Sequence, residues 1–132
     1  MKAVGMAFTL VLALTSSGSS VACGHCVEDR IAAVYDHALL QQTAARQQRI
    51  AYFALEGRFT RGDKERHQIR ALVEATPGVN QGSTRVSLEP AALAIAFDPR
   101  RSSAEAIETL LQKKLRAIKV SVLLLQSAPM RQ

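Results

Sequence analysis

The sequence predicts an α+β fold, and three observations indicate it. Apolar residues alternate in short strand-like segments, recur at helical spacing in the segments between them, and are interrupted by turn residues. From residue 50 to residue 125 these segments follow the order β-α-β-β-α-β. That order is the split βαβ plan of a ferredoxin-like sandwich. A further helix comes first, so we expect a ferredoxin-like β-α-β-β-α-β sandwich preceded by an N-terminal helix.

The first predicted strand, residues 50–56, is apolar on both faces, as a central strand is. Its alternating side chains are Ala51, Phe53 and Leu55 on one face and Ile50, Tyr52 and Ala54 on the other. Further strands are predicted at 83–88, 93–98 and 118–125. In the third strand the large side chains of Leu93, Ile95 and Phe97 share one face, and Ala92, Ala94 and Ala96 share the other.

The predicted N-terminal helix covers residues 26–46, a stretch without Gly or Pro. Glu28 and Asp29 stand in its first turn, where the helix dipole favours acidic side chains. Its second half is polar, so we expect it to fray into a linker.

Two further helices belong to the sandwich itself. Asp63 is the expected N-cap of the first, which runs to Thr76 before Pro77-Gly78. Ser102-Ser103-Ala104-Glu105 is the expected capping box of the second. The apolar stripe of that second helix consists of Ile107, Leu110, Leu111 and Leu115.

Residues 1–22 match the three parts of a secretory signal peptide. Lys2 gives a short basic start, residues 6–14 form an apolar core, and Ser20-Val21-Ala22 supplies the small residues that a signal peptidase requires. The core is too short to span a bilayer, which takes about 20 residues. We therefore expect a periplasmic or secreted protein whose mature chain begins at Cys23 and has no transmembrane segment.

Two alternatives stay open for this leader. It forms a buried N-terminal helix, or Val21-Ala22-Cys23 ends a lipobox and the chain is a lipoprotein anchored at Cys23. The expected organisation is a signal peptide (1–22), a Cys-Gly-His-Cys segment with a helix (23–49), a ferredoxin-like domain (50–126) and a tail (127–132).

Composition narrows the classes of function. The 132 residues carry a formal net charge of +6, yet an exported chain with only 5% aromatic residues does not suggest a nucleic-acid partner. A basic stretch fits either an acidic protein partner or a solvated face. It consists of Arg58, Arg61, Lys64, Arg66 and Arg70. No nucleophile elbow, phosphate loop or zinc-protease motif is present, so we do not expect an enzyme.

Two motifs resemble those of heavy-metal-associated domains, the small modules of copper chaperones and metal-transporting ATPases. Residues 69–79, ending in Pro77-Gly78-Val79, are similar to their first helix and turn, and Phe97-Asp98-Pro99 is similar to their third strand and turn. The resemblance spans residues 50–125. It implies a ferredoxin-like fold and a Cys-x-x-Cys pair before the first helix that binds a soft cation. The corresponding positions hold Gly62 and Glu65, so that site does not carry over to this chain.

A different Cys-x-x-Cys pair lies at Cys23-Gly24-His25-Cys26. Two thiolates three residues apart at a helix start can chelate a soft ion such as Cu(I), and the helix dipole is expected to keep them ionised. Cleavage before Cys23 would also create a free amine two residues before His25, a square-planar donor set for Cu(II) or Ni(II). We therefore predict a metal site formed by Cys23, His25 and Cys26.

Other interpretations of this cluster stay open. The tetrapeptide resembles the active site of protein disulfide isomerases, although no strand precedes it as in thioredoxin-like enzymes. It also fits a local disulfide or a lipidated Cys23. His37 lies eleven residues beyond Cys26, about 16 Å along a helix, so it cannot share that ion and is expected to be a packed residue. A site formed by His67 and Glu65 is equally well explained as a solvated face.

The expected function is that of an exported binding protein for a heavy metal, copper in particular, acting as a carrier or sensor. The alternatives are a non-metal protein-interaction module on the same fold and a thiol-disulfide redox protein.

Overall fold

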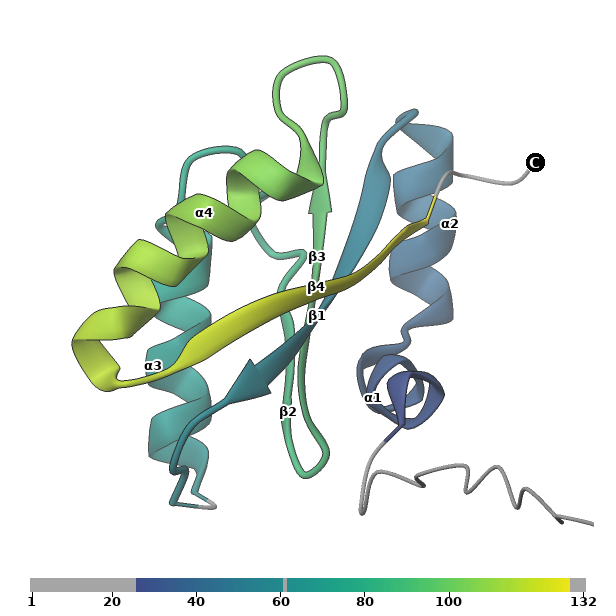
Figure 1. The fold of residues 1–132 in the computed structure, drawn as a ribbon. Coiled ribbons are helices and arrows are strands. Elements are labelled where there is room, and N and C mark those ends of the chain that lie inside the picture. Colours follow the sequence, from purple (N-terminus) through teal and green to yellow (C-terminus); the bar gives the residue numbers. More distant parts are fainter. Residues whose placement is uncertain (1–25, 61, 129–132) are drawn as a thin grey trace, which may run out of the picture.

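A computed structural model describes residues 26–60 and 62–128, and Figure 1 shows one four-stranded sheet at its centre. The strand order is β2-β3-β1-β4, and every neighbouring pair is antiparallel. This is the order of the split βαβ plan, so the predicted ferredoxin-like fold is confirmed. The strands are β1 (Arg49–Glu56), β2 (Arg85–Leu88), β3 (Ala91–Phe97) and β4 (Ser121–Ala128).

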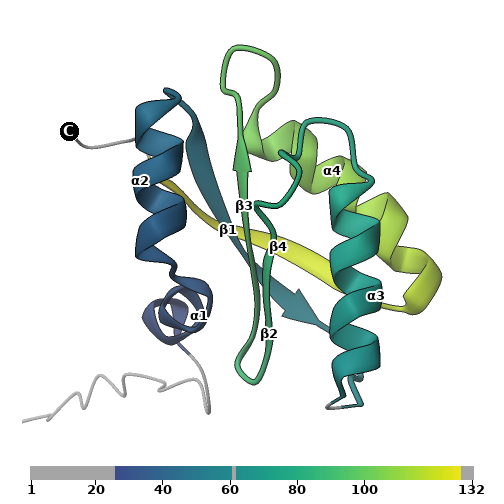
Figure 2. The ribbon, with the colours of Figure 1, turned by 180° about the vertical axis from the view of Figure 1, so that it is seen from behind.

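Helices cover both faces of this sheet, which makes three layers (Figures 1 and 2). The helices α3 (Asp63–Glu74) and α4 (Ala104–Leu115) lie on one face, as the split βαβ plan requires. The helices α1 (Val27–Val34) and α2 (His37–Ala45) lie on the other. A short 3₁₀ helix, η1 (Arg116–Ile118), follows α4. Within the described residues no helix has the length and apolar character needed to cross a membrane.

The central strand β1 is buried on both faces, as its alternation predicts. Phe53 faces the larger core beneath α3 and α4, whereas Tyr52 faces the smaller core beneath α1 and α2. Phe53 is 0% exposed and Tyr52 is 5% exposed. The larger core also contains Leu93, Ile95, Phe97, Ile69, Val73, Ile107, Leu111 and Leu115, and the smaller one contains Val34, Leu39, Ile50, Ala92, Ala94 and Ala96.

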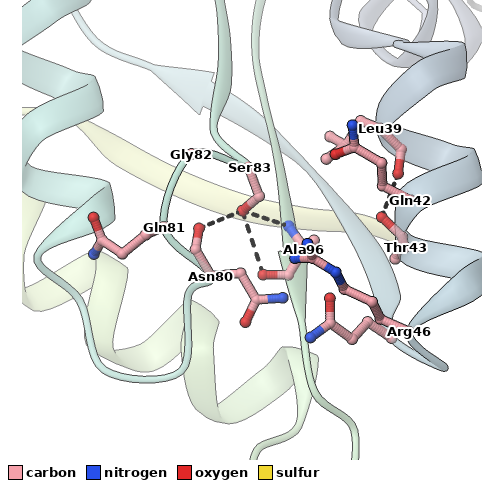
Figure 3. A pocket seen from close by; sticks show the side chains of 10 residues that line it. Leu39, Gln42, Thr43, Arg46, Asn80, Gln81, Gly82, Ser83 and Ala96 are labelled. Atoms are coloured by element: carbon pink, nitrogen blue, oxygen red, sulfur yellow. Dashed lines mark hydrogen bonds between the residues drawn. The ribbon is translucent and has the colours of Figure 1, made fainter.

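The second half of the N-terminal helical region does not fray, contrary to the prediction from its polarity. Leu39 and Thr43 of α2 are buried against the sheet, and the Thr43 hydroxyl donates to the Leu39 carbonyl one turn earlier (Figure 3). On the facing loop, the Ser83 hydroxyl accepts from the Ala96 N–H and donates to the Asn80 carbonyl. The buried hydroxyl groups of Thr43 and Ser83 thus have hydrogen-bond partners nearby. Burying them leaves no unpaired polar atom in these two side chains, so the polar half of the region can pack against the sheet.

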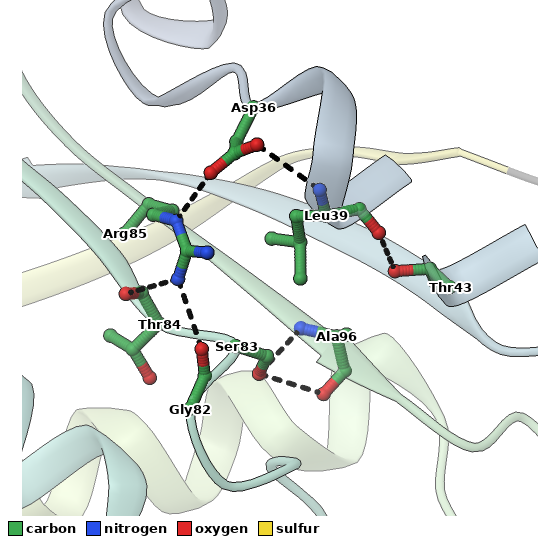
Figure 4. Close-up of polar contacts among 8 residues, drawn as sticks. All are labelled: Asp36, Leu39, Thr43, Gly82, Ser83, Thr84, Arg85 and Ala96. Carbon is green, nitrogen blue, oxygen red and sulfur yellow. Dashed lines mark hydrogen bonds and ion pairs between the residues drawn. The ribbon is translucent and has the colours of Figure 1, made fainter. Parts of the chain in front are cut away.

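The prediction of one continuous helix over residues 26–46 is wrong, because the chain breaks at Tyr35 and Asp36. Asp36 has extended dihedral angles, and its Oδ1 accepts from the Leu39 N–H at 3.1 Å, which caps α2. Its Oδ2 accepts from Arg85 Nε of β2 at 2.9 Å (Figure 4). The Arg85 guanidinium holds the pKa of the Asp36 carboxyl below its ordinary value. A capping aspartate with a distant ionic partner thus ends one helix and starts the next.

Both predicted N-caps are displaced by one residue. Gly62 is the N-cap of α3, and the Asp63 carboxylate instead pairs with Arg66 at 3.2 Å. Ser103 caps α4 by accepting from the Ala106 N–H at 3.1 Å. Ser102 lies one residue before the cap, and its own N–H donates to the Asp98 carbonyl in the preceding turn.

The last strand begins three residues later than predicted. The chain continues from α4 into η1, and Lys119 then adopts a left-handed conformation with φ of 60°. The strand therefore starts at Ser121 and includes Ser127 and Ala128, which were expected in the tail.

Side chains of α4 occupy backbone donors of the edge strand β4. The Val122 N–H donates to Gln112 Oε1 at 3.0 Å, and the Leu124 N–H donates to Glu108 Oε2. Four residues of helix rise about as far as two residues of strand, about 6 Å, so one helix face can serve alternate strand positions. An edge strand whose amides are already bonded is a poor template for pairing with another chain.

We predict that Leu39→Ala lowers the free energy of unfolding by about 2–5 kcal/mol, because a buried leucine is truncated. Chemical denaturation of the variant beside the wild type measures the loss. Leu123→Ala is the matched control, since Leu123 is 56% exposed and its truncation is expected to change little. Equal stability of the Leu39 variant and the wild type would show that α1 and α2 are not integral to the fold.

We also predict that the double substitution Glu108→Ala/Gln112→Ala promotes self-association, because two amide donors on the edge strand lose their acceptors. Sedimentation velocity over a concentration series is expected to show a larger species for this variant. Glu105→Ala, on the same helix but at a residue whose side chain makes no hydrogen bond to β4, is expected to sediment like the wild type. A double variant that does likewise contradicts the protective role.

Candidate functional site

The structure places Cys26 at the start of α1, where it is exposed and is the N-cap residue. Its carbonyl oxygen accepts from the Arg30 N–H at 3.2 Å, whereas its side chain makes no capping hydrogen bond. The thiol is thus accessible at the surface. The other two predicted ligands, Cys23 and His25, lie outside the described residues, so the three-residue site stays a prediction.

The electrostatic surroundings of Cys26 differ from those expected of a helix start. The Asp29 backbone N–H favours the thiolate, but the carboxylates of Asp29 and Glu28 together outweigh it, and the pKa of the Cys26 thiol is raised above its ordinary value. Ionisation by the helix dipole, which the sequence suggested, is therefore overridden by two acidic neighbours. A thiol of this kind is mostly protonated at neutral pH, and a metal ion must displace the proton.

The loop between β1 and α3 leads to Gly62 and Glu65, the two positions that correspond to the thiolate pair of heavy-metal-associated domains, and neither side chain has a thiol. Gly62 ends this loop as the N-cap of α3. Glu65 lies in the first turn of the helix, where its Oε2 accepts from the Thr60 hydroxyl at 2.8 Å. Among residues 26–60 and 62–128, no group of three or more His, Cys, Asp or Glu side chains is placed to hold a metal ion.

An open cleft of about 550 Å³ lies beside this loop, where β1 ends and β2 turns into β3. Its lining joins three parts of the chain that are far apart in sequence. At one of the lining residues, Gly57, the backbone passes close to the Lys119 carbonyl oxygen. Only glycine fits there, because φ is +156° and a Cβ would stand 2.9 Å from that oxygen. The lining residues are Arg30, Leu55, Glu56, Gly57, Arg58, Phe59, Leu88, Glu89, Pro90 and Ala91.

Arg30 ties α1 to this cleft. Its guanidinium Nη1 donates to the Ala91 carbonyl at 3.1 Å and to the Leu55 carbonyl at 3.4 Å. Arg30 lies one helical turn after Cys26, so the tether fixes the start of α1 near the cleft. Sequence reasoning missed this residue, because its two acceptors are backbone groups 25 and 61 residues away.

The two other histidines that the sequence offered as candidate ligands lie on different helices, α2 and α3. His37 is exposed, not packed, at the start of α2, and its Nδ1 lies 3.4 Å from the Tyr35 hydroxyl. His67 is exposed on α3.

A small polar pocket of about 40 Å³ between α2 and the loop before β2 has room for one water molecule or so (Figure 3).

Several solved structures have a similar backbone. A copper-binding domain from HMA7, a P-type ATPase, is 16% identical with a TM-score of 0.48, and the match covers 60% of this chain and 96% of that one. Oxidized MerP from Ralstonia metallidurans CH34 is 14% identical with a TM-score of 0.46, covering 60% and 99%. The yeast copper transporter domain Ccc2a is 16% identical with a TM-score of 0.46, covering 61% and 99%. No family model and no curated protein matches the chain.

We predict that Glu28→Gln/Asp29→Asn lowers the pKa of the Cys26 thiol, because it removes the carboxylates that oppose ionisation. The rate of alkylation by iodoacetamide against pH, measured in a Cys23→Ser background, reports this pKa. The variant is expected to react faster at pH 7.5 and to reach its plateau at lower pH. Asp63→Asn/Glu65→Gln removes the same charges from the first turn of α3 and is expected to change nothing. Coincident profiles for all proteins would refute the stated cause.

Proposed function

We propose that this protein is exported and binds a transition-metal ion, copper in particular, through Cys23, His25 and Cys26. The observation that carries the proposal is the position of Cys26, an exposed thiol at the start of α1 that lies three residues after the only other cysteine of the chain. Two sulfur atoms at this spacing can reach one ion. Thiolates prefer soft cations such as Cu(I).

The donor set offers two modes of binding. In the reduced protein the two thiolates hold Cu(I). When the chain begins at Cys23, its amine, two backbone nitrogens and the His25 imidazole offer four nitrogen donors to Cu(II), which prefers tetragonal geometry. Both modes use Cys23, so one excludes the other. The proposed role is that of a periplasmic carrier or sensor.

An acidic protein partner is a further part of this proposal. Lys64 is exposed on α3, and Arg66 and Arg70 are partly buried on the same helix. The Nε atoms of both arginines are shielded from solvent and have no hydrogen-bond partner among the described residues. Carboxylates of a partner would pair with the solvent-accessible parts of these cationic side chains, and not with the shielded Nε atoms.

A non-metal interaction module is the second candidate, and the loop before α3 favours it. Gly62 and Glu65 offer no thiolate, so the fold itself retains no soft-metal site in the described residues. The cleft beside that loop would then be a protein-binding surface.

Metal titration of the reduced, secreted protein separates the two candidates. We predict one Cu(I) per chain for the wild type and none for Cys23→Ser/Cys26→Ser, because that change removes both thiolates. For Cu(II), which is added to the oxidised protein because free thiols would reduce it, we expect His25→Ala to lose the tetragonal visible spectrum and the matched control His37→Ala to keep it. A wild type that binds neither ion rules out the metal function and leaves the interaction module.

A further inference from the structure

The large hydrophobic side chains that the described part of the chain exposes gather on two neighbouring elements, α1 and β4. Val27 and Tyr35 stand at the two ends of α1, Leu123 stands on β4, and each residue is 45–56% exposed. Single exposed apolar residues are ordinary on a protein surface, whereas a group of them marks an interaction site.

A groove of about 410 Å³ lies between these two elements. The helix α1 contributes Glu28, Ile31, Ala32 and Tyr35, and β4 contributes Gln126. The four helical residues follow the spacing i, i+3, i+4 and i+7, which places them on one side of α1. One wall of the groove is therefore a mostly apolar helix face that does not rest on the sheet.

The adjoining face of β4 is left uncovered by the N-terminal helices. Gln126 pairs with Tyr52 of β1, and Leu123 pairs with Ala54, with a shift in register between the two pairs. Tyr52 and Ala54 share one face of β1, and cross-strand partners share that face, which is the one beneath α1 and α2. However, α1 packs against β1, β2 and β3, and α2 packs against β1. Leu123 thus extends the apolar surface along β4.

The size of this surface favours a short segment over a second copy of the chain. Even at about 250 Å² for a whole aromatic side chain, three half-exposed side chains present less than about 400 Å². Each partner of a stable complex buries about 800 Å². The groove suits one or two inserted side chains better than the broad surface of another folded domain.

The charge beside the groove favours a cationic occupant. Glu28 lines it, Asp29 follows in the same turn, and both are exposed. No basic side chain of the described residues lines the groove, and Arg30 instead donates to the carbonyls of Leu55 and Ala91. Two carboxylates attract a lysine or arginine and repel an anionic phospholipid surface.

We propose that this groove binds a short segment of another protein that carries a large apolar side chain close to a lysine or arginine. The apolar side chain enters between α1 and β4 and contacts Ile31 and Tyr35, and the cation pairs with Glu28. Tyr35 is the expected anchor, because aromatic residues carry much of the binding energy of such contacts. The inference goes beyond the proposed metal site, since none of the lining residues is a predicted ligand.

Peptide selection with a pair of groove variants tests this proposal. Random dodecapeptides displayed on phage are selected on the purified wild-type chain, and we expect them to combine a large apolar residue with Lys or Arg. In fluorescence anisotropy their synthetic copies are expected to bind Ala32→Arg about tenfold or more weakly, because the new side chain fills the groove and repels a cation. Ala33→Arg is the matched control, since Ala33 is also exposed on α1 but does not line the groove. It is expected to match the wild type.

The charge contribution is measured with a second pair of variants. Glu28→Gln is expected to weaken peptide binding severalfold and to reduce its dependence on salt, whereas Glu105→Gln, in the first turn of α4, is expected to change neither. Failure to select any peptide, selection of acidic peptides, or equal binding to Ala32→Arg and the wild type would overturn the proposal. A dimer, or binding to phosphatidylglycerol vesicles, that Ala32→Arg abolishes would also overturn it, because the occupant would then be a second copy or a membrane.

Discussion

The burial of β1 on both faces is the constraint on which the rest of the structure depends. A strand that is apolar on both sides needs a cover above and below the sheet. The helices α3 and α4 supply one cover, as in the two-layer ferredoxin-like plan. Ile50 and Tyr52 would remain in water without α1 and α2. The N-terminal helices are therefore a third layer of the sandwich and not an appendage to it.

Two polar ties position that third layer. The Asp36 carboxylate bonds Arg85 of β2 near the break between the helices, and Arg30 bonds backbone carbonyls at the ends of β1 and β3. Burial alone is non-directional and would let a helix slide over the alanine-rich face of β3. Hydrogen bonds to fixed backbone groups prevent this, and they bring the start of α1, with Cys26, to the loop end of the sheet.

Most of the sandwich could be predicted from periodicity, because period two and period 3.6 distinguish strands from helices. Element boundaries could not, since they depended on competing hydrogen bonds. Ser103, and not Ser102, accepts the capping hydrogen bond from the Ala106 N–H, and α4 ran on into η1 before Lys119 turned the chain. The candidate site was predictable only as a pair of cysteines, and the cleft, Arg30 and the acidic surroundings of Cys26 followed from contacts between distant segments.

The sequence by itself determined the order of elements, the two-sided burial of β1, and the absence of thiols from the loop at Gly62 and Glu65. Local composition and spacing are enough for each of these. Only the tertiary structure decided that the N-terminal region forms two packed helices, that the pKa of the Cys26 thiol is raised, and that Arg30 joins α1 to the cleft at the end of β1. These depend on which distant groups share a surface, and folding alone brings those groups together.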